Sequence, residues 1–178
     1  MLIAAVLALL LAAGVAAAKP ARVVSLNLCA DQFVVALAER ERIVALSPLA
    51  ADHALSAVAA DAAGMPRVRP IAEEVLPLRP DLAIVGAWGA ARVALMLEAR
   101  GVAVLRLGLA EDFDAILVQL RRVAAALGEQ ARGEALARSI AHDLAALPPP
   151  PADPPRALVW QARGFVPGHG TLPDAVLR

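Results

Sequence analysis

The chain has 178 residues, of which 60% are apolar, 19% are charged and 3% are aromatic. This balance excludes a disordered or collagen-like chain. The 17 basic side chains equal the 17 acidic ones, so there is no net positive field to attract nucleic acid or an anionic membrane. The single cysteine, Cys29, excludes an internal disulfide and a zinc site made of four thiolates.

Residues 2–11 form an uninterrupted apolar run. The run is too short for a membrane-spanning helix of roughly 20 residues and fits the hydrophobic region of a signal peptide. Small residues at 16–18 precede Lys19 and Pro20, which predicts cleavage after Ala18. A signal normally begins with a basic residue, and none precedes this run, so a buried N-terminal helix or strand is the alternative. No cysteine follows the run for lipid attachment, and we expect a soluble periplasmic protein.

Short β-branched and aliphatic runs then alternate with helical patterns. This is the arrangement of βα units that build a parallel sheet buried on both faces. The expected strands cover residues 22–26, 43–46, 82–85 and 102–107. Apolar residues at spacings of three and four predict helices over residues 31–39, within 52–62, and over 72–78 and 91–100. We expect Asp31 to cap the first helix, Pro80 to end the third and Gly101 to end the fourth.

Two helical patterns follow without a strand between them, over residues 112–127 and 129–147, separated by Gly128. The second ends at a proline-rich stretch, residues 148–155, which favours an extended connector. Beyond it we expect a strand over residues 157–161, a glycine-rich loop over 163–171 and a helix from Leu172. These last residues, roughly two dozen, are too few to bury a core of their own.

The predicted fold class is therefore α/β, with a parallel-sheet Rossmann-like lobe, a long interdomain helix and the start of a second α/β lobe. The expected parts are a signal peptide (1–18), an N-terminal α/β lobe (19–128), a bridging helix (129–147), a proline-rich linker (148–155) and an incomplete C-terminal lobe (156–178).

Four segments carry a resemblance to a known family. RVVSLNLCADQFVVALAERERIVALS (22–47) resembles the opening of the substrate-binding proteins of ABC importers for ferric siderophores and cobalamin. EEVLPLRPDLAIVGAWG (73–89), the segment from GVAVLRLGL to IAHDLAAL (101–147) and VWQARGFVPGHGTLPDAVL (159–177) follow in the family's order and spacing. The resemblance implies two α/β lobes bridged by a rigid helix, with ligand in the cleft between them and only a small closing motion.

A full member of that family would continue for about another hundred residues, the size of a further domain. The resemblance therefore predicts a second lobe that is truncated here. A remnant of such a protein that does not bind ligand is the alternative.

Ligands of open parallel sheets lie beyond the carboxyl ends of the strands, where we expect loops at residues 27–30, 47–52, 86–90 and 108–111. Trp88 would give a flat ligand an aromatic wall, or would cap the core. Trp160 lies in an expected strand, so core packing is its alternative, and Asn27 could simply form a turn. The candidate ligand-binding residues come from these loops and from the segment that resembles the start of the second lobe. They are Asn27, Cys29, Leu49, Trp88, Gly89, Leu109, Trp160 and Phe165.

Glu73 aligns with the family glutamate that docks on arginines of the membrane permease. The adjacent Glu74 is the alternative for the docking residue. A solvated glutamate in a first helical turn is the alternative. A basic cleft would favour anionic siderophores, with Arg92, Arg106 and Arg163 as candidates.

The three histidines, His53, His142 and His169, show no metal-binding spacing. An exported hydrolase using Cys29 or Ser47 is a rival hypothesis, although no G-x-S-x-G motif is present. The resemblance implies a non-enzymatic periplasmic solute-binding protein, which we expect to be monomeric and without a cofactor, catalytic residue or metal site. It would carry an iron–siderophore or cobalamin-type chelate to an ABC transporter permease.

Overall fold

The computed structural model describes residues 18–178, so the predicted signal peptide, apart from Ala18, lies outside the described residues. A four-stranded sheet holds β1 (Val23–Ser25), β2 (Ile43–Ala45), β3 (Leu82–Val85) and β4 (Ala103–Arg106). The strands lie in the order β2-β1-β3-β4, and every neighbouring pair is parallel. The four predicted strands and the α/β class are confirmed.

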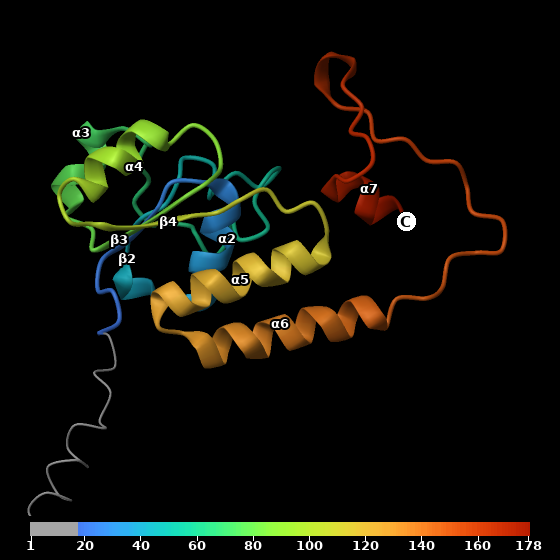
Figure 1. The fold of residues 1–178 in the computed structure, drawn as a ribbon, viewed down its shortest axis with the longest axis horizontal. Helices are drawn as coiled ribbons and strands as arrows, with labels where there is room; N and C mark the ends of the chain where they lie inside the picture. The colour runs from blue at the N-terminus through green and yellow to red at the C-terminus, as the bar shows by residue number, and fades with distance from the viewer. Residues whose placement is uncertain (1–17) are drawn as a thin grey trace, which may run out of the picture.

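Helices cover both faces of the sheet. The helices of the described residues are α2 (Leu28–Leu37), α3 (Ala72–Val75), α4 (Ala91–Glu98), α5 (Phe113–Leu127), α6 (Gln130–Ala145) and α7 (Leu172–Leu177). Short 3-10 turns lie at η1 (Arg40–Arg42), η2 (Leu76–Leu78) and η3 (Ala162–Gly164). In Figure 1, α3 and α4 lie on one side of the strands, and α5, with α6 beyond it, lies on the other.

Neighbouring strand residues supply two separate cores because successive side chains point to opposite faces of a sheet. Val23, Leu82 and Ile84 pack with α2 and α5, whereas Val24, Ala83 and Val85 pack with α3 and α4. Both central strands, β1 and β3, are buried along their whole length. Apart from Ser25, their residues are apolar without alternation, as expected for a sheet covered on both faces.

The hairpin of α5 and α6 turns at Gly128, whose φ of 72° is left-handed and suits glycine. The two helices approach closely at Gly133 of α6. The absence of a side chain there permits this approach, since a Cβ at that position would overlap the side chain of Ala124 on α5. The N-terminal half of α6 is anchored in this way, and Ala137, one turn further on, is also buried. That α6 joins two lobes stays a prediction.

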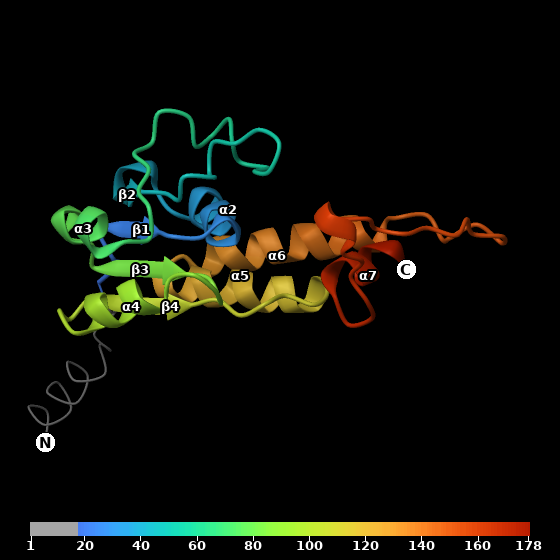
Figure 2. The same cartoon turned by 90° about the horizontal axis from the view of Figure 1, so that it is seen from above.

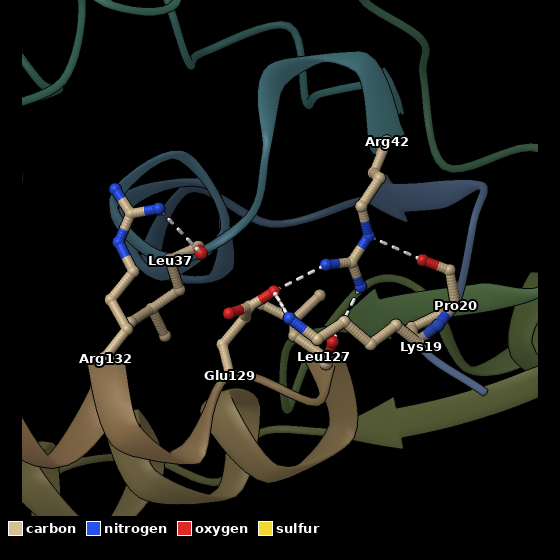
Figure 3. Close-up of polar contacts among 7 residues, drawn as sticks. All are labelled: Lys19, Pro20, Leu37, Arg42, Leu127, Glu129 and Arg132. Atoms are coloured by element: carbon tan, nitrogen blue, oxygen red, sulfur yellow. Dashed lines mark hydrogen bonds and ion pairs between the residues drawn. The ribbon is translucent and has the colours of Figure 1, made fainter. Parts of the chain in front are cut away.

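A polar cluster fastens this hairpin to the start of the described chain (Figure 3). Arg42, only 8% exposed, donates to the carbonyls of Pro20 (2.7 Å) and Leu127 (2.6 Å) and to Glu129 Oε1 (2.7 Å). Lys19 Nζ lies 2.7 Å from the same Glu129 oxygen. Hydrogen bonds from Lys19 and Arg42 hold the pKa of Glu129 below its ordinary value.

The strand order places a topological switch point between β1 and β3. From β1 the chain moves outward to β2 on one side, and it returns to β3 on the other side. Open α/β sheets bind ligands at the carboxyl ends of the strands beside such a point. Figure 2 shows β1 and β3 pointing toward the end of the molecule where α7 lies.

The helix predicted within residues 52–62 is wrong, because this segment forms a series of turns. The Asp52 carboxylate accepts from the Ala54 N–H at 2.8 Å, a local bond that competes with helix formation. Further along, the guanidinium of Arg40 donates to the carbonyls of Asp61 and Ala63, each at 2.9 Å.

The predicted cap of the first helix is also wrong. Asn27 caps α2 by accepting from the N–H groups of Cys29 and Ala30, while Asp31 lies inside the helix and is fully buried. The turn that Gly101 was expected to make is confirmed by its φ of 77°.

The strand predicted over residues 157–161 is wrong. A strand needs a hydrogen-bonded neighbour, and among the described residues none pairs with this segment. It closes on itself instead, with Gln161 N donating to the Phe165 carbonyl at 2.9 Å. Across residues 18–178, no helix combines the length and apolar character required to traverse a lipid bilayer.

Candidate functional site

A cavity of about 430 Å³ opens beyond the carboxyl ends of β1, β3 and β4. The loops after these strands meet there with the first turns of α2 and α5. The lining residues are Asn27, Cys29, Gln32, Phe33, Gly86, Ala87, Trp88, Leu107, Gly108, Leu109, Ala110, Ile116, Gln119 and Leu172. The cavity thus lies at the switch point that the strand order defines.

Asn27 and Gly86 form the floor where β1 and β3 end. The Asn27 Oδ1 accepts from Cys29 N at 2.9 Å and from Ala30 N at 3.4 Å, which fixes the amide in place. A Cβ on Gly86 would overlap this amide. Glycine at position 86 is therefore required by space, so that the loop after β3 can pass over the side chain that caps α2.

Trp88 stands in the loop between β3 and α4 and lines the cavity, yet 75% of it is exposed. The alternative that it caps the core is therefore excluded. Phe33 lines the cavity from α2 and is half-buried. The cavity thus has aromatic side chains from two elements, as sites for large flat ligands do.

The lining carries no charged side chain; its polar side chains are the amides of Asn27, Gln32 and Gln119 and the thiol of Cys29. None of the three candidate arginines lines this cavity. Arg106 is paired with Glu98, Arg92 lies beside a different hollow, and Arg163 lies in η3.

Of the eight predicted ligand residues, the structure brings four together in the lining: Asn27, Cys29, Trp88 and Leu109. The other four, Leu49, Gly89, Trp160 and Phe165, do not line it. Trp160 is 71% exposed, so the core role considered for it is wrong as well.

Sequence reasoning found Cys29 but missed the other residues that the helices contribute. Cys29, Gln32 and Phe33 recur at spacings of three and four on α2, and Ile116 and Gln119 are three apart on α5. These spacings place side chains on one helical face. The signal was therefore present in the sequence, in the first two turns after each strand-end loop.

Asp31 and Ser47 lie buried beneath this end of the sheet. Burial raises the pKa of Asp31, and hydrogen bonds from Ser25 and Ser47 oppose the rise. The Ser47 hydroxyl donates a hydrogen bond to Asp31, so it has a structural role. Cys29 has no His, Asp or Glu beside it in the lining, and Ser47, whose hydroxyl is bound to Asp31, does not line the cavity. Among residues 18–178, no group of three His, Cys, Asp or Glu side chains is placed to hold a metal ion.

The two candidate docking glutamates differ in their surroundings. Arg69 donates to Glu74 from its Nε (2.6 Å) and its backbone N (2.7 Å), which lowers the pKa of Glu74. Glu73 is exposed and lines a hollow of about 200 Å³ with Arg92 and Met96. Glu73 is thus the freer of the two carboxylates.

Comparisons with known proteins agree with this geometry. The model of the periplasmic binding protein family matches residues 23–178. A periplasmic heme-binding protein from Pseudomonas aeruginosa is 28% identical, with a TM-score of 0.59 over 71% of this chain and 45% of its own. The apo heme-binding protein RhuT from Roseiflexus sp. RS-1 is 26% identical, with a TM-score of 0.66 over 88% of this chain and 62% of its own.

A possible iron-binding, periplasmic solute-binding protein from Staphylococcus epidermidis shares the fold, with 17% identity and a TM-score of 0.74 over 90% of this chain and 65% of its own. The chain thus spans between about half and two thirds of the length of these relatives. The comparison with curated proteins gives no match. Since the family model covers nearly all of the described residues, this chain belongs to the periplasmic binding protein family.

Proposed function

We propose that this chain supplies the first ligand-binding lobe of a periplasmic solute-binding protein, which binds a metal chelate and delivers it to an ABC importer. The observation that carries the proposal is the uncharged, aromatic-walled cavity at the switch point. Its volume of about 430 Å³ lies within the range of small-molecule sites, about 300–1,000 Å³.

A flat macrocyclic chelate suits this lining best. Trp88 and Phe33 give the lining aromatic surface for a planar ligand, and a chelate whose metal is already coordinated needs no metal site from the protein. The relatives from Pseudomonas aeruginosa and Roseiflexus, both above 25% identity, are described as heme-binding, so heme is the first candidate within the class. Cobalamin and ferric siderophores remain the alternatives, although an anionic siderophore would find no cation in the lining.

Delivery requires docking on a permease. The exposed Glu73 is suited to pair with arginines of such a partner, since charge pairing fixes orientation. We place the protein in the periplasm, exported by the segment before Lys19, and we expect it to act as a monomer without enzymatic activity.

The proposal is tested by titrating the full chain, purified from the periplasm, with hemin, cyanocobalamin and ferrichrome while following tryptophan fluorescence, and by equilibrium dialysis of the probe for the tryptophan variants. Trp88→Ala removes a lining residue, and Trp160→Ala is its matched control because Trp160 lies outside the lining. We expect one probe to quench fluorescence saturably, with binding lost in Trp88→Ala and kept in Trp160→Ala. A folded protein that binds none of the three probes would instead support the remnant hypothesis.

A further inference from the structure

Gln119 is a buried polar side chain that the sequence did not single out. It lies in the second turn of α5, is 9% exposed and lines the cavity. Its Oε1 accepts a hydrogen bond from Arg122 Nη1 at 2.9 Å. Arg122 is held in turn, because its Nη2 donates to the Arg106 carbonyl at the end of β4, at 3.1 Å.

This contact fixes which way the Gln119 amide faces. A guanidinium has donors only, so the oxygen of the amide must face Arg122 and the amino group must face away from it. Within residues 18–178, the Gln119 Nε2 has no hydrogen-bond acceptor. Among these residues Ser56 Oγ is the one fully buried side-chain atom without a hydrogen-bond partner, so the Gln119 Nε2 is accessible from the cavity, where a ligand or water can complete it.

The loop after β4 leaves room for this amino group. A Cβ on Gly108 would lie 3.2 Å from the Gln119 Nε2, and Gly108 also lines the cavity. Gly108 does not have a left-handed φ, so space rather than backbone conformation explains the glycine. The Nε2 therefore faces the part of the cavity wall that carries no side chain.

We infer that Gln119 is a specificity-determining donor, whose Nε2 binds an oxygen acceptor at the edge of the chelate. This inference rests on the proposed function and adds to it the ligand chemistry that the site selects. With no cation in the lining, the amide recognises the ligand's carboxylate or carbonyl by direction. Arg122 acts as a positioning residue that keeps the donor turned inward.

The test compares hemin, which has two propionate carboxylates, with iron etioporphyrin, which has none. Wild type is expected to bind hemin about 10-fold more tightly than iron etioporphyrin, the effect of one hydrogen bond to a charged group. Gln119→Met fills similar space without a donor, and it should bring the ratio of the two dissociation constants close to one. Gln119→Glu keeps the partner of Arg122 but turns the donor into an acceptor, so it should weaken hemin binding further. Gln130→Met, at an exposed position on α6, is the matched control and should preserve the ratio.

The possible outcomes distinguish a failure of this inference from a failure of the proposed function. If wild type binds hemin but the hemin to etioporphyrin ratio is the same in Gln119→Met, the inference about Gln119 is overturned and the proposed function stands. If wild type binds neither compound while circular dichroism shows it folded, heme binding fails and the inference fails with it. A merely structural role would lower affinity for both compounds alike, which also contradicts the inference.

Discussion

Asp31 of α2 accepts two hydrogen bonds from Ser47 in the loop after β2, one from the hydroxyl at 2.5 Å and one from the backbone N–H at 3.1 Å. Both residues are buried. The pair ties the start of α2, which supplies three cavity-lining residues, to the neighbouring strand end. The position of the cavity wall therefore depends on a buried carboxyl.

This pair predicts a pH dependence of stability. Because burial raises the pKa of Asp31 above its ordinary 3.8, ionisation costs the folded state more than the unfolded state. The contribution of Asp31 is therefore complete below pH 3.8 and falls as the pH rises through the raised pKa. The advantage of wild type over Asp31→Asn in urea unfolding should shrink between pH 4 and pH 7; an advantage that grows over this range would contradict the account. Asp31→Ala leaves the Ser47 N–H without its acceptor and should cost about 1–3 kcal/mol.

Glu129 predicts the opposite pH dependence. Its pKa is lowered from 4.5 by Lys19 and Arg42, so its contribution is present above pH 4.5 and is lost as the pH falls through the lowered pKa. Glu129→Gln should lower the free energy of unfolding by about 1–2 kcal/mol at pH 7 and by less at pH 3. Glu134→Gln, which breaks the exposed pair with Arg121, is the control and should have a smaller effect at pH 7. Equal effects of the two variants would refute the special role of the Glu129 cluster.

Gly86→Ala tests the floor of the cavity. The added methyl group would overlap the Asn27 amide, and relieving such overpacking costs about 1–3 kcal/mol. We expect a lower melting temperature and weaker hemin binding. Gly168→Ala is the control because its Cβ would meet no atom within 4 Å. The close contact of Asn27 with Gly86 would be in doubt if both variants behaved like wild type.

Glu73 and Glu74 can be separated by function. Glu73→Ala should leave the hemin dissociation constant unchanged and lower hemin uptake in cells that carry the cognate permease. Glu74→Ala breaks the contact with Arg69 and should affect folding before docking. Glu41→Ala, at another exposed glutamate, controls for loss of surface charge. Normal uptake with Glu73→Ala would remove this residue from the docking surface.

The sequence predicted the parallel strands and the helix pair because their signals are local: apolar runs for β1 and β3, and Gly128 between α5 and α6. It failed at residues 157–161, since a strand depends on a neighbour that no local pattern reveals. It failed at Asp31 because the spacing did not distinguish a capping residue from one buried inside the helix. Trp88 and Asn27 were found from their loops, whereas Gln119 was missed because only the fold brings its side chain against Gly108 at the cavity wall.

The central claim is that ligand occupies the cavity beyond β1, β3 and β4, and Cys29 reports on it directly. It is the only cysteine, its thiol is free and exposed, and it lines that cavity. The decisive measurement is the rate at which a maleimide alkylates Cys29 with and without saturating hemin, with Trp88→Ala as the non-binding control. The account predicts that hemin slows alkylation in wild type, because a ligand that fills the cavity covers the thiol, and that it leaves the rate in Trp88→Ala unchanged. An unchanged rate in wild type that has bound hemin would show that the ligand lies elsewhere.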